Sequence, residues 1–353
     1  MRLAGLNRAL SASPWTRPAL AVLAFAVWGA FAAIHAYVKA ADFYVFWTAA
    51  QHAGAPYDPA MIAQLEARLH VTGAWPFVYP PTFLLAIWPF GRLPLALAYP
   101  LWTGLSAALF IWAASHLVKP PLATLALFVT PPVVLAIAPG QTSLAVGAAM
   151  IAGWLTLDKR PALAGVLFAL AACIKPQAMV MAPILLWGHW RAARWATIAG
   201  LTLIISSFIF GPGLWLEWPR ALADFGAVAP ATDRVNPSAL LASPVLAAAL
   251  ALLGVWIAWT WRDLTGLVAG ALCLTPYAHQ YDLAPLAPVA LTWLIERKRF
   301  GWGRAVCGAG LLAGLVSAPA AGLAFVLGLA AVRGWERRTP APRQAIPAPQ
   351  INL

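Results

Sequence analysis

The chain has 353 residues, of which 62% are hydrophobic and only 10% are charged, and its mean hydropathy is +0.77. A water-soluble domain cannot cover so much apolar surface, so the composition predicts an all-α, polytopic integral membrane protein without a separate soluble domain. The net charge of +12 comes from bases scattered among short loops between apolar segments. This positive-inside pattern indicates membrane lipids as partners and excludes a nucleic-acid-binding surface.

Motifs for metals, nucleotides and disulfides are missing from the sequence. Cys173, Cys273 and Cys307 lie far apart in apolar segments, which favours neither a disulfide framework nor a metal site. The chain contains no Walker loop, no nucleophile elbow and no dinucleotide fingerprint. Asp42 also lacks a second carboxylate two residues on, as a divalent ion site would often use. We therefore expect a reaction that needs no cofactor, no metal and no soluble nucleotide.

The first apolar segment, Pro18–Val38, is long enough to cross a membrane and is expected to be an uncleaved helix. Apolar residues then recur at i, i+3, i+4 and i+7 from Phe43 to Ala50, which predicts a short helix lying on the membrane surface. Asp42 stands between the two segments, where a carboxylate is costly to keep near lipid. It is either a site residue or the N-cap of the short helix.

Basic clusters define the expected topology. We place them all in the cytoplasm: the N-terminus and residues 159–160, 191–194, 262, 297–304 and 333–338. Because Asp42 is expected outside the membrane and Lys159 inside, the chain between them must cross the membrane an odd number of times. Segments 95–117, 121–138 and 141–157 supply three, and segment 82–90 is interpreted as re-entrant or interfacial. The whole chain is expected to cross about 10–12 times. Residues 1–332 are expected to form one domain, followed by a disordered, basic and Pro-rich cytoplasmic tail at 333–353.

This topology places Asp42, Gln141, Lys175 and His279 on one side of the membrane. Lys175 precedes a helix-breaking proline deep in apolar sequence, so it needs an anionic partner or a wet cavity, unless its ammonium extends to the interface. His279 lies in a turn rich in Tyr and Asp, where an ordinary loop role is the alternative. Gln141 is either a site residue or a partner for backbone groups at a Pro–Gly turn. Asp58 is interpreted as a turn residue.

The order of several stretches resembles glycosyltransferase family 87, the polyprenyl-phosphate-mannose-dependent mannosyltransferases of the GT-C superfamily. The stretches are the aspartate after the first helix leading into an aromatic, Ala-Ala and Pro-Tyr-Asp segment, then Tyr79-Pro80-Pro81, Gly140-Gln141, and the apolar run that ends at Lys175-Pro176. Asn236-x-Ser238 and the His279 turn follow in the same order. The chain departs from the family pattern at His279-Gln280, where relatives often show paired histidines, and in its compact outer loops.

The resemblance implies a GT-C membrane fold, an outward-facing active site and Asp42 as the catalytic aspartate. We expect Lys175 and His279 to bind the donor phosphate, because the leaving group gains charge and needs a fixed cation. Tyr79, Gln141, Asn236 and Gln280 are the candidate substrate-binding residues.

The predicted function is an inverting hexosyl transfer from a polyprenyl-phosphate sugar donor to a lipid or glycan acceptor. The sugar is expected to be mannose, and the site is expected to face the periplasm from a bacterial inner membrane. The alternative is a lipid-linked sugar flippase or a small-molecule transporter, with Asp42 and Lys175 along its path. The absence of repeated halves with matching helix breaks disfavours that alternative. A scaffold without activity would leave Lys175 unexplained.

Overall fold

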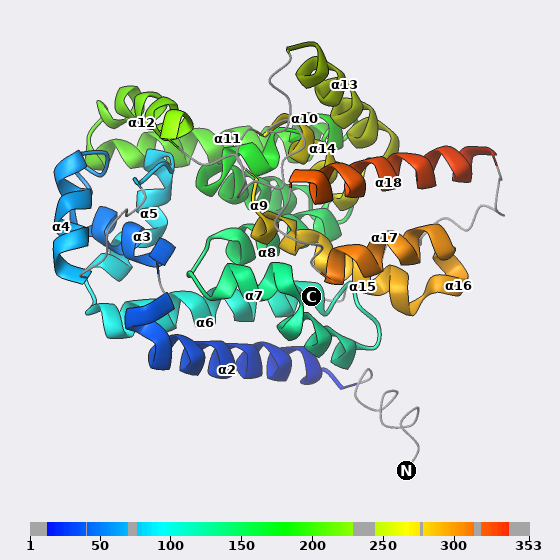
Figure 1. Ribbon diagram of the computed structural model, residues 1–353, viewed down its shortest axis with the longest axis horizontal. Coiled ribbons are helices and arrows are strands. Elements are labelled where there is room, and N and C mark those ends of the chain that lie inside the picture. The colour runs from blue at the N-terminus through cyan, green and yellow to red at the C-terminus, as the bar shows by residue number, and fades with distance from the viewer. Residues whose placement is uncertain are drawn as a thin grey trace.

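The computed structural model describes residues 13–39, 41–69, 76–228, 244–275, 278–313 and 319–338. Within these ranges it contains helices and no strands, so the all-α prediction is confirmed (Figure 1). The helices, in chain order, are α2 (Thr16–Lys39), α3 (Ala41–Gln51), α4 (Pro59–Leu69), α5 (Pro81–Gly91), α6 (Leu95–Ala114), η1 (Pro121–Val129), α7 (Pro131–Ile137), α8 (Ser143–Thr156), α9 (Pro161–Ile174), η2 (Pro176–Met179), α10 (Ala182–Leu185), α11 (Trp190–Ser207), η3 (Phe208–Phe210), α12 (Leu214–Val228), α13 (Pro244–Trp261), α14 (Leu264–Leu274), η6 (Gln280–Leu286), α15 (Ala287–Ile295), α16 (Arg297–Phe300), α17 (Trp302–Ala313) and α18 (Pro319–Arg338).

Within the described ranges, four helical segments are long and apolar enough to cross a membrane: Thr16–His35, Leu95–Ala114, Trp190–Phe210 and Pro244–Trp261. The third, which is α11 with η3, exposes apolar side chains such as Ile198, Leu201 and Ile205 along its length. In water this exposure would be unfavourable, whereas lipid accommodates it. The chain is therefore a polytopic membrane protein, and the full number of crossings stays a prediction.

Proline divides two of the apolar segments. The predicted break at Lys175-Pro176 is confirmed, since α9 ends at Ile174 and the short η2 follows. Segment 121–138, expected to be one crossing, instead forms η1 and α7. Two consecutive prolines, Pro131 and Pro132, explain this difference, because each lacks an N–H donor and the residue before a proline avoids helical backbone angles.

The last helix extends into the segment that was expected to be a disordered tail. Residues 333–338, predicted to be disordered, form the last turns of α18. Arg304 of α17 binds Glu336 through two hydrogen bonds of 2.5 and 2.8 Å, and Arg333 donates to the carbonyl of Thr260 at 2.8 Å. These contacts hold the end of α18 on the rest of the protein, while residues 339–353 lie outside the described ranges.

Some helices, such as α2 and α18, lie along the long axis of the molecule, whereas α13 is inclined to it (Figure 1). α2 and α6 run antiparallel and in close contact, while α3, α4, α5 and α12 gather at one end. α3 was expected to lie on the membrane surface, but it is buried on several faces, with Phe43, Tyr44 and Phe46 at most 5% exposed. Aromatic residues of α5 and α6 cover it; the ring centroids of Phe46 and Phe83 lie 5.2 Å apart. Packing within the protein therefore fixes the helix that carries Asp42.

Candidate active site

A tight turn at residues 138–141 holds the start of α3 in place. The backbone N–H of Phe43 donates to the carbonyl of Pro139 at 2.9 Å. Tyr99 and Trp102 of α6 donate to two other carbonyls of this turn, at 2.7 and 2.8 Å. Because three separate segments meet there, the turn sets the position of Asp42 relative to the residues that follow the turn.

Gly140 is essential to this turn, because its φ is +76° and a Cβ there would lie 2.7 Å from the Cβ of Phe43. Gly140→Ala is expected to lower the free energy of unfolding by roughly 2–4 kcal/mol, the sum of left-handed backbone strain and overpacking. Gly188→Ala is the matched control, since its φ is +93° but nothing lies within 4 Å of the added carbon. Thermal unfolding in detergent measures both variants. Equal losses would show that contact with Phe43 is unimportant.

Gln141 connects Asp42 to Tyr79. Its side-chain oxygen accepts hydrogen bonds from the Tyr79 hydroxyl at 3.0 Å and from the Thr142 backbone N–H at 3.3 Å. The amide nitrogen is thus left to donate, and the side chain of Gln141 hydrogen-bonds the Asp42 carboxylate. Gln141 is 5% exposed, so this network is buried; Gln141 satisfies a backbone group of the turn, as the alternative held, and also links Tyr79 to Asp42. The structure therefore brings together three predicted site residues.

Asp42 lies in the first turn of α3, outside the membrane-spanning segments. It is surrounded by protein on most sides yet keeps partial exposure. Burial raises the pKa of Asp42 to about 6, while the hydrogen bond from Gln141 and the charge of Lys175 act in the opposite direction. Asp42 is the second residue of α3 and so lies within the helix, whereas an N-cap residue precedes it. Its side chain also hydrogen-bonds Gln141. Both observations disfavour the interpretation of Asp42 as an N-cap.

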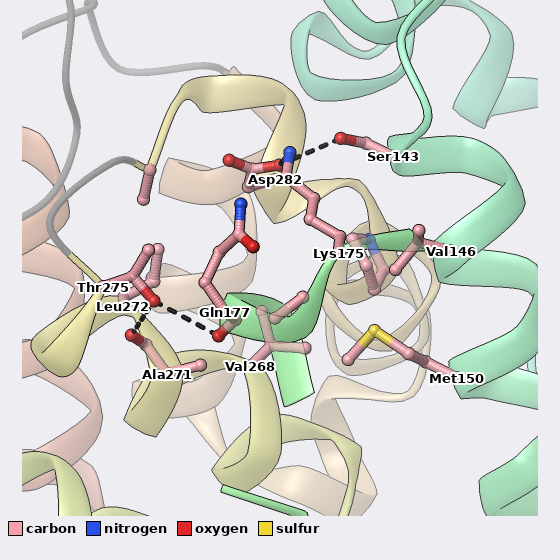
Figure 2. A pocket seen from close by; sticks show the side chains of 13 residues that line it. Ser143, Val146, Met150, Lys175, Gln177, Val268, Ala271, Leu272, Thr275 and Asp282 are labelled. Carbon is pink, nitrogen blue, oxygen red and sulfur yellow. Dashed lines mark hydrogen bonds and ion pairs between the residues drawn. The ribbon is translucent and has the colours of Figure 1, made fainter. Parts of the chain in front are cut away.

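Lys175 forms a buried ion pair with Asp282, and the two side chains are only 7% and 14% exposed. The same Asp282 oxygen accepts a hydrogen bond from the hydroxyl of Ser143 at 2.9 Å, and the other oxygen accepts from the backbone N–H of His279 at 3.0 Å. Figure 2 shows Lys175 and Ser143 pointing toward Asp282 from different elements. Asp282 is therefore the anionic partner that Lys175 was expected to need.

Asp282 is the main site residue that the sequence interpretation missed. It joins the start of α8, the end of α9 and the His279 turn, and its charge also acts on Asp42. The sequence did contain a signal that could have identified Asp282: it lies three residues after His279, in a chain with only 11 acidic residues.

The His279 turn is packed against Lys175 through an aromatic ring. The ring of His279 stacks on Tyr281 with centroids 5.0 Å apart, and the Lys175 ammonium lies 5.0 Å from the centroid of Tyr281. Gln280 begins η6 beside His279, but no hydrogen bond within the described ranges ties its side chain to the site. Asn236 lies outside the described residues, so its predicted role is untested.

A cavity of about 30 Å³ adjoins the ion pair and is lined by Lys175, Asp282, Ser143, Gln177 and apolar side chains (Figure 2). This volume holds a water molecule or two but not a sugar. Among the described residues, no group of three His, Cys, Asp or Glu side chains gathers as a metal site would need. The absence of a metal requirement stays a prediction.

The fold and the site together define a polytopic membrane protein in which a largely enclosed carboxylate, Asp42, lies within electrostatic reach of the Lys175–Asp282 ion pair. The model of a family described as Glycosyltransferase family 87 matches residues 77–278, more than half of the chain. The chain belongs to glycosyltransferase family 87 and is a membrane glycosyltransferase. No curated protein and no solved structure matches it. The matched residues include Gln141 and Lys175 but neither Asp42 nor Asp282.

Proposed function

We propose that this glycosyltransferase moves a hexose, mannose foremost, from a polyprenyl-phosphate sugar to a lipid or glycan acceptor. The observation that carries the proposal is the union of Asp42 and the Lys175–Asp282 pair in one polar site, built from segments far apart in the chain. A carboxylate and a cation in one site suit a reaction that removes a proton from one substrate and expels a phosphate from the other. The distribution of basic loops supports a periplasmic orientation in a bacterial inner membrane.

Asp42 acts as the general base. It takes the proton of the acceptor hydroxyl while that oxygen forms a bond to the anomeric carbon, and the bond from this carbon to the phosphate oxygen breaks. A pKa of about 6 leaves Asp42 ionised at neutral pH and close to the value that makes a base efficient there. Gln141 holds the carboxylate in position through its side-chain amide. No covalent glycosyl-enzyme intermediate forms in this reaction.

Lys175, together with His279, stabilises the departing phosphate, which leaves with the bonding electron pair and gains a second negative charge. In the absence of substrate, Asp282 balances the charge of Lys175. As the leaving phosphate gains charge, it competes with Asp282 for Lys175 more strongly than the singly charged phosphodiester of the donor does. Lys175 then interacts more strongly with the transition state than with the bound donor, and only such a difference accelerates the reaction.

The proposal is tested by incubating the purified protein in lipid nanodiscs with radiolabelled polyprenyl-phosphate mannose and a membrane lipid extract. Polyprenyl-phosphate glucose and a nucleotide-linked mannose serve as parallel donors. We expect label to move from a polyprenyl-phosphate sugar into a new product with wild-type protein but not with Asp42→Asn. Failure of every polyprenyl-phosphate sugar to donate would overturn the proposal. Movement of the intact sugar lipid across sealed vesicles, without a new product, would favour a flippase.

A further inference from the structure

An apolar groove of about 760 Å³ runs along one face of α11, between this helix and parts of α5, α9, α10 and α12. Its α11 wall extends from Trp190 through Ala193, Ala196 and Gly200 to Ile204. These positions span about 21 Å at the helical rise per residue, more than the roughly 15 Å thickness of one hydrocarbon leaflet. The side chains that line the groove carry no charge. The groove can therefore accept an apolar chain of lipid length.

The groove is separate from the cavity beside the ion pair. Cys173 and Pro176 line the groove, but the side chain of Lys175 between them lines the small cavity with Asp282. The ammonium of Lys175 is thus directed away from the groove, and a phosphate bound at Lys175 lies outside it. A lipid whose headgroup binds at another place fits the groove better.

One end of the groove carries arginine side chains on tryptophan rings. Trp190 lines the groove, and the guanidinium groups of Arg191 and Arg194 lie 5.6 and 5.4 Å from the centroid of its ring. Trp190 is 62% exposed, as suits a residue at the boundary between lipid and water.

A third arginine reaches the same end from another helix. Trp187 also lines the groove, and its ring centroid lies 6.2 Å from that of Trp259 in α13. The guanidinium of Arg262 lies 4.0 Å from the centroid of Trp259. In the described part of the chain, no carboxylate forms an ion pair with Arg191, Arg194 or Arg262. Asp158 lies at this end too, 3.3 Å from His189 beside Trp190, but three arginines against one exposed carboxylate leave the end of the groove positively charged.

We propose that this groove binds an anionic phospholipid of the cytoplasmic leaflet. The headgroup phosphate contacts the three arginines, which are expected on the cytoplasmic side, and one acyl chain extends along α11. Guanidinium groups bind phosphate with two parallel hydrogen bonds, and tryptophan rings favour the headgroup level of a bilayer. A soluble anion would leave the apolar groove unfilled.

The predicted preference for an anionic headgroup is tested with detergent-purified protein. Two quantities are measured: the shift in the unfolding temperature when lipid is added, and the lipid retained in native mass spectrometry. Phosphatidylglycerol is compared with phosphatidylcholine of the same acyl chains. We expect phosphatidylglycerol to bind more tightly. Arg191→Gln/Arg194→Gln should weaken its binding by tenfold or more, on the order expected for two arginines near a membrane surface. Arg297→Gln/Lys298→Gln removes two exposed charges from α16, which lies well away from α11 (Figure 1). This pair is the matched control and should change binding less than about twofold.

The predicted position of the acyl chain in the groove is tested by Gly200→Phe, whose side chain would fill the groove. A Cβ at Gly200 meets nothing within 4 Å, so the fold should tolerate the substitution, while retention of phosphatidylglycerol should fall. Equal binding of the two phospholipids, equal loss in the control pair, or undiminished retention in Gly200→Phe would each overturn the proposal. So would a Gly200→Phe variant that loses polyprenyl phosphate and keeps phosphatidylglycerol, because the groove would then hold the donor chain.

Discussion

Replacing Asp42 by asparagine is expected to lower turnover by about 10²–10⁴-fold at neutral pH, the usual effect of losing a general base. Asparagine keeps the shape of the side chain and can still accept the hydrogen bond from Gln141, but it cannot take a proton. Lipid binding and expression should therefore persist. Near-normal turnover in Asp42→Asn would contradict the assignment of Asp42 as the base.

The raised pKa of Asp42 adds two further expected results. Wild-type turnover should fall as the pH decreases through about 6, because protonated Asp42 cannot act as a base. Stability has the opposite dependence: the neutral carboxyl is favoured in the fold, so the stability present below the unfolded pKa of 3.8 is lost as the pH rises through about 6. At pH 7, Asp42→Asn should thus be as stable as wild type, or more stable by up to roughly 2–3 kcal/mol.

Asp58→Asn is the control for Asp42. Asp58 is exposed, and its carboxylate accepts a hydrogen bond from the backbone N–H of Ala60 at 2.8 Å, at the start of α4. Asparagine caps a helix about as well as aspartate does. Turnover and thermal stability should therefore stay close to those of wild type, and a large loss of turnover would show that the outer loop tolerates no change of charge.

Replacing Lys175 by methionine is expected to lower the free energy of unfolding by about 3–5 kcal/mol, because it leaves the buried carboxylate of Asp282 without its partner. Turnover should also fall, since the departing phosphate loses a cation. Thermal unfolding and label transfer measure the two effects separately.

The double variant Lys175→Met/Asp282→Asn distinguishes the structural role of the pair from its catalytic role. Removing both charges should recover most of the stability, because no unpaired buried charge remains. Turnover should stay low. Recovery of turnover together with stability would mean that Lys175 is structural, and the phosphate would then have to bind elsewhere in the site.

Much of the fold could be predicted from the sequence, because membrane composition and proline breaks are local signals. Lys175-Pro176 ends α9 as predicted, and the same physics at Pro131-Pro132 should have divided segment 121–138. The burial of α3 could not be predicted, since its periodicity showed one apolar face. Aromatic residues of α5 and α6 cover its other faces, and local sequence does not show such long-range packing.

The site was predictable where a residue is anomalous in its own surroundings. Lys175 is a cation in apolar sequence, and Asp42 is a carboxylate at the end of a spanning segment. Asp282 stands in a polar turn and is not anomalous there, and 107 residues separate it from Lys175. Only the fold brings the two together, so Lys175 predicted the existence of an anionic partner but not its identity.

The most direct test of single displacement at this site is the anomeric configuration of the transferred sugar. It is measured by NMR, from the one-bond carbon–hydrogen coupling at the anomeric carbon, on product made from a donor of known configuration. In the proposed mechanism Asp42 acts only as a base and no carboxylate attacks the anomeric carbon, so the acceptor oxygen displaces the phosphate directly. We therefore expect inversion relative to the donor. Retention would show that the acceptor oxygen does not displace the phosphate directly from the opposite face, and it would contradict the proposed mechanism.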